Sequence, residues 1–167
     1  MKPPVLLLAL LAVSAAVASA QNTPPPAPPE ARQFDFWIGE WEVFSPDGKK
    51  AGENRIEKMA NGWGLLENWT GAGGGTGKSL NSWHPDKKRW QQYWVGLGGA
   101  LEISGGLENG AMVMTGEATA PNGNKMRNRI TWTPSADGTV RQLWEQSTDD
   151  GKTWKTVFDG RYRRKGS

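Results

Sequence analysis

The sequence predicts an all-β protein, a single up-and-down antiparallel β-barrel of about ten strands. Short segments of alternating polar and apolar residues recur roughly every 10 to 14 residues. Gly, Asn, Asp and Pro separate these segments in combinations typical of tight turns. No stretch sustains the apolar period of a helix. A meander this long leaves two exposed edges unless it closes on itself, which favours a barrel over the alternative, a two-sheet sandwich.

Residues 1–20 have the features of a secretory signal peptide. Met1-Lys2 provides the positive start, an apolar run follows from Val5 to Val17, and Ala18-Ser19-Ala20 is a small-residue cleavage site. We therefore expect cleavage near Ala20 and a periplasmic or secreted protein that does not insert into the membrane afterwards. The chain has no cysteine, which excludes lipid attachment at a processed cysteine and any disulfide.

Residues 21–32 are expected to form a proline-rich spacer, and residues 33–167 a single barrel domain. The net charge of +3 is too balanced for a general affinity for nucleic acid, so we expect no nucleic-acid partner. Nothing in the sequence sets the oligomeric state. With no disulfide the core must hold the fold by itself, and ten tryptophans can supply it.

The domain begins with a short plug and a half-buried strand. Gln33–Trp37 is the one segment expected to form a helical turn, as a lid or plug before the first strand. From Glu40 the residue types alternate, with the two glutamates on one face and Trp41 and Val43 on the other.

The remaining strands follow the same rule. The expected strands are Glu40–Ser45, Glu53–Met59, Leu65–Thr70, Ser79–His84, Arg89–Val95, Leu101–Gly105, Ala111–Ala118, Lys125–Thr133, Val140–Ser147 and Trp154–Tyr162. The expected turns are Pro46-Asp47-Gly48, Asn61-Gly62, Asn109-Gly110, Pro121-Asn122-Gly123, Asp137-Gly138 and Asp150-Gly151.

The opening string of the domain resembles a known family. Phe34-Asp35-Phe36-Trp37-Ile38-Gly39-Glu40-Trp41 is similar to the start of the DUF1579 family of exported bacterial proteins. Its Gly39-Glu40-Trp41 step resembles the Gly-x-Trp of lipocalin-like (calycin) barrels. The resemblance implies a barrel like those of lipocalins and fatty-acid-binding proteins and, by analogy, small-molecule binding. It also implies that an arginine from near the chain's end lies over Trp41, with Arg163 the first choice and Arg161 the second.

Two motifs are interpreted as hairpins. Ala72–Ser79 fits a relaxed phosphate-loop pattern, but proline soon follows where that loop needs a helix, so we expect a glycine-rich hairpin at the rim of a pocket. Ser147–Trp154 matches the Asp-box, Ser-x-Asp-x-Gly-x-Thr-Trp, in a single copy. We therefore assign Asp149, Gly151 and Trp154 structural roles, alongside Gly39, Trp41 and the two arginines named above.

No metal site or cofactor is expected. His84 is the only histidine, no cysteine accompanies it, and Trp83-His84-Pro85-Asp86 has the composition of a turn.

The inward faces of the expected strands combine aromatic side chains with amides and one carboxylate. On the last strand Trp154, Phe158 and Tyr162 are expected to point inward. The Glu67 strand is ambiguous, because Leu66 favours the opposite face. The candidate ligand-binding residues are Glu67, Trp69, Trp83, Gln92, Trp94, Asn128, Gln142 and Trp144. Buried polar groups need partners, so the alternative to a ligand pocket is a water-filled network that fixes the strand register.

The leading hypothesis is an extracytoplasmic protein that binds a small apolar or amphipathic molecule inside a tryptophan-lined barrel. A carbohydrate-binding module is an alternative, because tryptophans and amides suit sugar rings and hydroxyls. An enzyme is another, since Glu67, Glu145 and Asp149 are able to transfer protons. Nothing pairs those carboxylates by sequence, so no catalytic residue is assigned.

Overall fold

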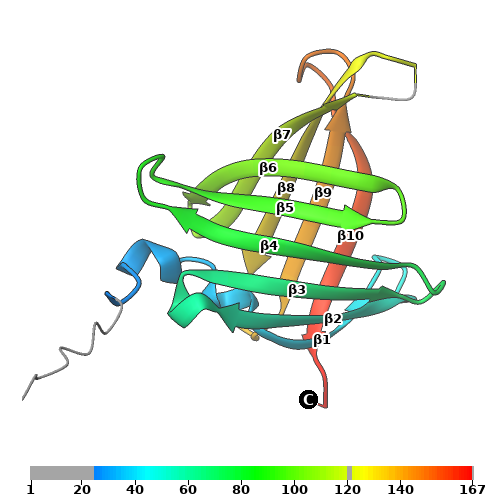
Figure 1. Ribbon diagram of the computed structural model, residues 1–167. Helices are drawn as coiled ribbons and strands as arrows, with labels where there is room; N and C mark the ends of the chain where they lie inside the picture. Colours follow the sequence, from blue (N-terminus) through cyan, green and yellow to red (C-terminus); the bar gives the residue numbers. More distant parts are fainter. Residues whose placement is uncertain (1–24, 120–121, 167) are drawn as a thin grey trace, which may run out of the picture.

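Ten antiparallel strands close into one barrel in the computed structural model, which describes residues 25–119 and 122–166 (Figure 1). Each strand pairs with its neighbours in the chain, and β1 pairs with β10 to complete the ring. The predicted up-and-down barrel is confirmed, and a two-sheet sandwich is excluded. The expected signal peptide and the first residues of the spacer lie outside the described residues.

The elements follow one another with short connections. They are η1 (Pro29–Arg32), η2 (Asp35–Trp37), β1 (Gly39–Phe44), β2 (Lys50–Met59), η3 (Ala60–Gly62), β3 (Gly64–Gly71), β4 (Thr76–His84), β5 (Arg89–Gly96), β6 (Gly99–Glu108), β7 (Ala111–Thr119), β8 (Lys125–Pro134), β9 (Val140–Ser147) and β10 (Lys155–Arg164). Every expected strand overlaps an observed one. The ends differ by a few residues, because backbone pairing continues through lysines and glycines that the alternating pattern does not mark. Within the described residues, no helix has the length and apolar character needed to cross a membrane.

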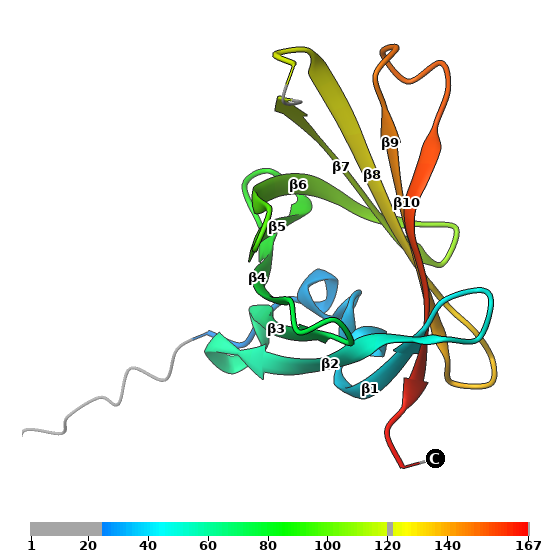
Figure 2. The same cartoon turned by 90° about the vertical axis from the view of Figure 1, so that its right-hand side faces the viewer.

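Helical turns and aromatic side chains fill one end of the barrel, here called the closed end. Phe34 and Trp37 are fully buried, and their rings stack with centroids 4.8 Å apart. Trp132 on β8 packs against both rings at centroid distances of 5.1 and 5.4 Å. Figure 2 shows the helical turns, in blue, within the curve of the strands. The predicted plug before the first strand is confirmed, and it makes this end of the barrel dry.

An arginine of β10 covers Trp41 at the closed end, but it is Arg164 and not the expected Arg163 or Arg161. Its guanidinium carbon lies 4.1 Å from the centroid of the Trp41 ring, and Nη1 donates to the Ile38 carbonyl over 2.7 Å. Trp41 and Arg164 are paired across β1 and β10. A Cβ at Gly39 would lie 2.0 Å from Arg164 Nη1, so glycine is required for this close approach.

The error in the sequence prediction is one of parity. Tyr162 points into the barrel, so Arg164, two residues on, shares its side, and Arg161 and Arg163 point outward. Arg163 therefore lies outside, with its guanidinium 4.8 Å from the Phe44 ring centroid, and Arg161 is exposed.

The other end is open. Strands β7–β10 extend beyond the rest of the ring and carry two long hairpins (Figures 1 and 2). The glycine-rich segment forms the β3–β4 turn at this end, where the Gly71 amide donates to the Gly75 carbonyl and β4 begins at the next residue. A strand follows where a phosphate loop needs a helix, so the interpretation as a hairpin is confirmed.

The β9–β10 hairpin has the hydrogen bonding expected of an Asp-box. Asp149 accepts from the Thr153 amide over 2.9 Å and from the Ser147 hydroxyl over 2.7 Å, and these bonds, with that of the Thr153 hydroxyl, lower the pKa of Asp149 to about 2. Asp150 and Gly151 turn the chain with positive φ angles of 64° and 88°.

Trp154 does not point into the barrel as expected. It precedes β10, donates to the Gly151 carbonyl over 3.1 Å, and stacks with the Arg129 guanidinium at 4.1 Å from the ring centroid. Arg129 lies outside the barrel, between the inward-facing Asn128 and Ile130. A register shift between Thr156 and Phe158 breaks the alternation of β10, which is why extrapolating from Tyr162 placed Trp154 on the wrong face.

We predict that Arg164→Ala destabilises the barrel by about 1–2 kcal/mol, because it removes both the stack on Trp41 and a charged donor to the Ile38 carbonyl. Urea unfolding measures the loss. Arg163→Ala is the matched control and should cost less, since its stack lies on the outer face. Equal losses for the two variants would contradict the role assigned to Arg164.

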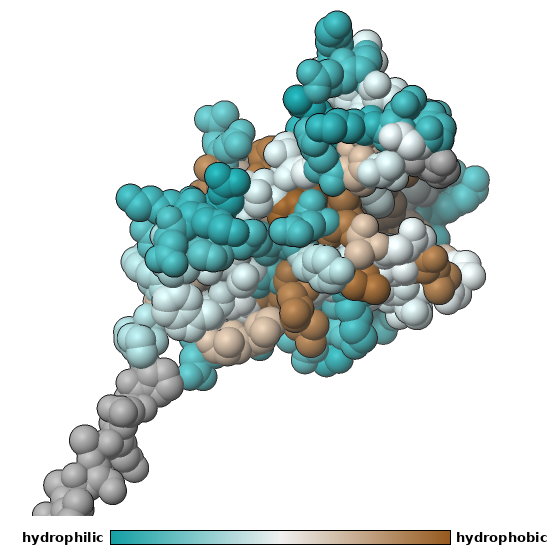
Figure 3. Space-filling model, turned by 45° about the horizontal axis from the view of Figure 1, so that its top comes forward, coloured by the Kyte–Doolittle hydropathy of each residue, from teal (hydrophilic) through white to brown (hydrophobic). Residues whose placement is uncertain are grey.

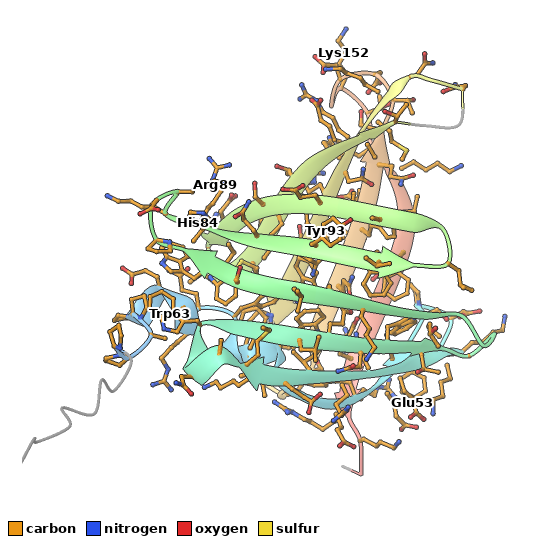
Figure 4. All side chains as sticks on the ribbon, viewed as in Figure 1. Glu53, Trp63, His84, Arg89, Tyr93 and Lys152 are labelled. Atoms are coloured by element: carbon orange, nitrogen blue, oxygen red, sulfur yellow. The ribbon has the colours of Figure 1, made fainter. Side chains whose placement is uncertain are left out.

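We also predict that Asp149→Ala and Gly151→Val each lower the denaturant midpoint. The first removes the acceptor of the hairpin, and the second forces a branched residue into a positive-φ position. Lys152→Ala, at the exposed tip of the same hairpin (Figure 4), is the control and should leave the midpoint unchanged. Midpoints equal to wild type for the first two variants would show that the Asp-box does not stabilise this fold.

Candidate functional site

A cavity enters the barrel from the open end in two connected parts. The inner chamber has a volume of about 200 Å³, and the outer mouth about 610 Å³. Trp69, Trp94, Leu101 and Trp144 line both, so the mouth leads directly into the chamber. The remaining lining of the chamber is Glu67, Gln92, Ile130, Gln142, Val157, Phe158 and Tyr162. In Figure 3, which brings the open end forward, hydrophobic side chains gather between hydrophilic hairpin tips.

The tryptophans of the cavity lie along its wall because glycines on adjacent strands leave room for them. A Cβ at Gly77 would come within 2.2 Å of the Trp94 ring, and one at Gly52 within 2.7 Å of the Trp69 ring. Phe158 lies over Gly160 in the same way, with 2.6 Å to a hypothetical Cβ. Trp69 and Phe158 also meet edge to face at 6.0 Å. These aromatic rings form much of the chamber lining.

A ladder of buried polar side chains crosses the floor of the chamber. Gln92 donates to Asn81 over 2.7 Å, Asn81 donates to Ser79 over 2.8 Å, and Ser79 donates to Glu67 over 2.6 Å. Asn54 approaches from β2 and donates to the other oxygen of Glu67 over 2.7 Å. Every donor in this series of hydrogen bonds points toward the Glu67 carboxylate, and that arrangement stabilises the ionised form of Glu67.

Tyr162 extends the ladder to the far wall. Its hydroxyl accepts from Asn54 over 3.2 Å and donates to the side-chain carbonyl of Gln142. Burial and the neighbouring Glu67 raise the pKa of the Tyr162 hydroxyl well above its usual range, so it stays protonated and acts as a donor to Gln142. The ladder thus runs continuously from β5 to β9.

Glu67 is the central group of this ladder and is only 4% exposed. Burial raises its pKa from the ordinary value of 4.5 to about 7, against the opposing effect of the bonds from Ser79 and Asn54. Hydrogen bonds alone therefore do not offset the cost of desolvating the charge. Near neutral pH the group titrates, so both forms are populated.

Six of the eight candidate ligand-binding residues line the inner chamber: Glu67, Trp69, Gln92, Trp94, Gln142 and Trp144. Asn128 lines the mouth, where its side-chain oxygen accepts from the Trp144 indole over 2.9 Å. Its buried amide nitrogen has no hydrogen-bond partner among the described residues. Trp83 lies apart from both, because it pairs with Trp90 toward the closed end of β4 and β5.

Residues that sequence reasoning did not select complete the site. Ser79 shares the inward face of Asn81, so the alternating pattern of β4 could have identified it. Asn54 is inward on β2 and pairs across the sheet with Trp69, but a single amide among charged residues gives no such signal. Val157 reaches the chamber only because of the register shift in β10.

Other reactive groups lie outside the cavity. Glu145 faces outward and forms an ion pair with Arg129 at 2.9 Å, and Asp149 is held in its hairpin. Neither carboxylate lines the chamber, so in the described part of the chain Glu67 has no second carboxylate there for acid–base chemistry. His84 lies at the β4–β5 turn, paired with Arg89 (Figure 4). The described residues contain no cluster of three or more histidine or acidic side chains able to hold a metal ion.

Comparison with known proteins adds no assignment. A scan against protein-family models finds no match, and no curated protein matches the chain significantly.

We predict that Glu67 makes the folded protein less stable as the pH rises from about 4.5 to about 7. In that window the unfolded chain has lost the proton while the folded protein retains it, so the free energy of unfolding falls. Above about pH 7 the loss is constant, at about 3 kcal/mol. Urea unfolding of Glu67→Gln across this window should show a flatter profile than wild type, whereas Glu102→Gln, on the outer face of β6, should not. Parallel profiles for wild type and Glu67→Gln would contradict the raised pKa.

Proposed function

We propose that this protein binds a small apolar or amphipathic molecule inside the barrel, in an extracytoplasmic compartment that it reaches after residues 1–20 are removed. The observation that carries the proposal is the two-part cavity, whose chamber has tryptophan walls and a polar floor. Such a combination of apolar enclosure with a few fixed polar groups is typical of small-molecule sites. The signal-peptide features of residues 1–20 support the compartment.

The division of the barrel into a dry end and an open end also favours binding. The aromatic plug fills the closed end, whereas the core residues of the open half leave a cavity between them. Glycines on neighbouring strands leave the space in which the Trp69 and Trp94 rings lie. A barrel selected only for stability would fill this volume, because interiors are normally close-packed.

The proposal is tested with N-phenylnaphthylamine, an uncharged hydrophobe that fluoresces in apolar surroundings. We expect saturable enhancement, transfer of excitation from the tryptophans, and competition by the natural ligand. Mass spectrometry of protein purified from its native host identifies that ligand directly. Saturable binding of monosaccharides with no uptake of the hydrophobe would instead favour a carbohydrate-binding module.

A glycine substitution tests whether the lumen is the site. Gly77→Ala places a methyl group where the Trp94 ring lies, so we predict that the ring swings into the cavity and weakens N-phenylnaphthylamine binding by about tenfold or more. Gly106→Ala is the matched control, because a Cβ there meets nothing within 4 Å. Unchanged affinity in a folded Gly77→Ala protein would place the binding site elsewhere.

A further inference from the structure

Glu67 has no positive partner in the chamber. None of the described residues that line the inner chamber is basic. The groups that contact the carboxylate are Asn54 from β2 and Ser79 from β4, with Tyr162 of β10 beyond Asn54. Other charges on these strands serve elsewhere, since Lys58 pairs with Asp35 at 2.8 Å and Arg164 stacks on Trp41. Neutral donors stabilise an anion but leave its charge uncompensated.

The carboxylate also retains capacity to bind. A carboxylate offers about four acceptor positions, and each oxygen of Glu67 accepts one hydrogen bond from the protein. Gln92, which also lines the chamber, adds a second acceptor, because its amide nitrogen donates to Asn81 while its oxygen has no partner among the described residues. The floor of the chamber therefore presents acceptors to whatever enters.

The tryptophan walls of the cavity also favour a positively charged ligand. Trp69, Trp94 and Trp144 come from three different strands and lie around the passage between mouth and chamber. The faces of indole rings carry partial negative charge and attract cations, more strongly where water is excluded. An anion entering this passage would meet aromatic faces and then a carboxylate, so the site disfavours it.

We propose that the inner chamber selects an organic cation, a protonated amine on a small apolar body, with its ammonium at Glu67 and its body between the tryptophans. This inference rests on the proposed function and narrows it to one charge class of ligand. The ammonium donates to the carboxylate and to Gln92, and it supplies the missing counter-charge. Ligand binding then favours the ionised form of Glu67, and a protonated Glu67 has to release its proton for the ion pair to form.

The test uses three ligands with nearly the same body and different charge: phenylethylammonium, phenylethanol and phenylpropanoate. Their affinities are measured by calorimetry at about pH 8, where an alkylamine is protonated as a lysine side chain is and Glu67 is mostly ionised. We expect the cation to bind at least about tenfold more tightly than the alcohol, and the anion most weakly. At about pH 6 the preference for the cation should fall by up to about tenfold, because Glu67 is then mostly protonated.

Two variants locate the charge that is responsible. Glu67→Gln, checked for cooperative unfolding, should lose the preference for phenylethylammonium over phenylethanol. Glu102→Gln removes an exposed carboxylate outside the barrel and should keep it. The pH comparison on the unmodified protein decides the question if Glu67→Gln does not fold.

The outcomes separate the two proposals. Equal binding of cation and alcohol, or tightest binding of the anion, would overturn the selection for cations while leaving an apolar binding site in place. A preference for the cation that survives in Glu67→Gln would also overturn it, by assigning the attraction to another group. Failure of all three ligands and of N-phenylnaphthylamine to bind would overturn the proposed function itself.

Discussion

The pairing of β1 with β10 is the interaction on which the enclosed interior depends. It runs from Trp41 opposite Arg164 to Phe44 opposite Arg161, and it turns a strip of strands into a ring without edges. Once the ring is closed, the period of two along each strand sends every second side chain inward. The Arg164 guanidinium then covers Trp41 at the closed end, where β1 begins and β10 ends. The register of β1 against β10 therefore closes the barrel, buries the plug and forms the chamber.

The interior is divided between two kinds of packing. Phe34, Trp37, Trp41 and Trp132 form a dry aromatic core that is close to fully buried. Above it lies the polar ladder that centres on Glu67, and above that the tryptophan-lined mouth. The dry half provides hydrophobic stabilisation, and the ladder costs some of it, because desolvation of the carboxylate exceeds what its hydrogen bonds return.

Sequence was a good guide wherever the alternating pattern alone decides the answer. It placed all ten strands, the plug and most inward faces, and it resolved Ala72–Ser79 as a turn. The sequence left the inward face of the Glu67 strand ambiguous, because Leu65 and Leu66 are both apolar and point to opposite faces. Leu66 in fact lies outside, where it pairs with Leu80, which in turn pairs with Tyr93 on the outer wall. Figure 4 labels Tyr93.

Sequence was a poor guide wherever alternation is broken or distances decide. A register shift in β10 moved Trp154 out and Val157 into the chamber lining. An error of one residue in the inward parity of β10 put Arg163 in place of Arg164. The width of the lumen depends on ring orientation, which is set by contacts with glycines on neighbouring strands, as Gly77 does for Trp94. No local pattern encodes such a contact.

A carboxylate in this ladder is more than a device to fix the register. Asn81 and Gln92 show that amides hold strands together in the same interior without a charge. A glutamine at position 67 would accept from Asn54 and donate to Ser79 at no desolvation cost of an ion. Burial of Glu67 is instead opposed by the hydrogen bonds from Ser79 and Asn54, and the outcome is a pKa of about 7. A group so balanced changes protonation in response to small changes around it, including the arrival of a positive charge or the displacement of water. If the proposed cation binds here, the stability lost by keeping Glu67 is the cost of a site that responds to the charge of its occupant.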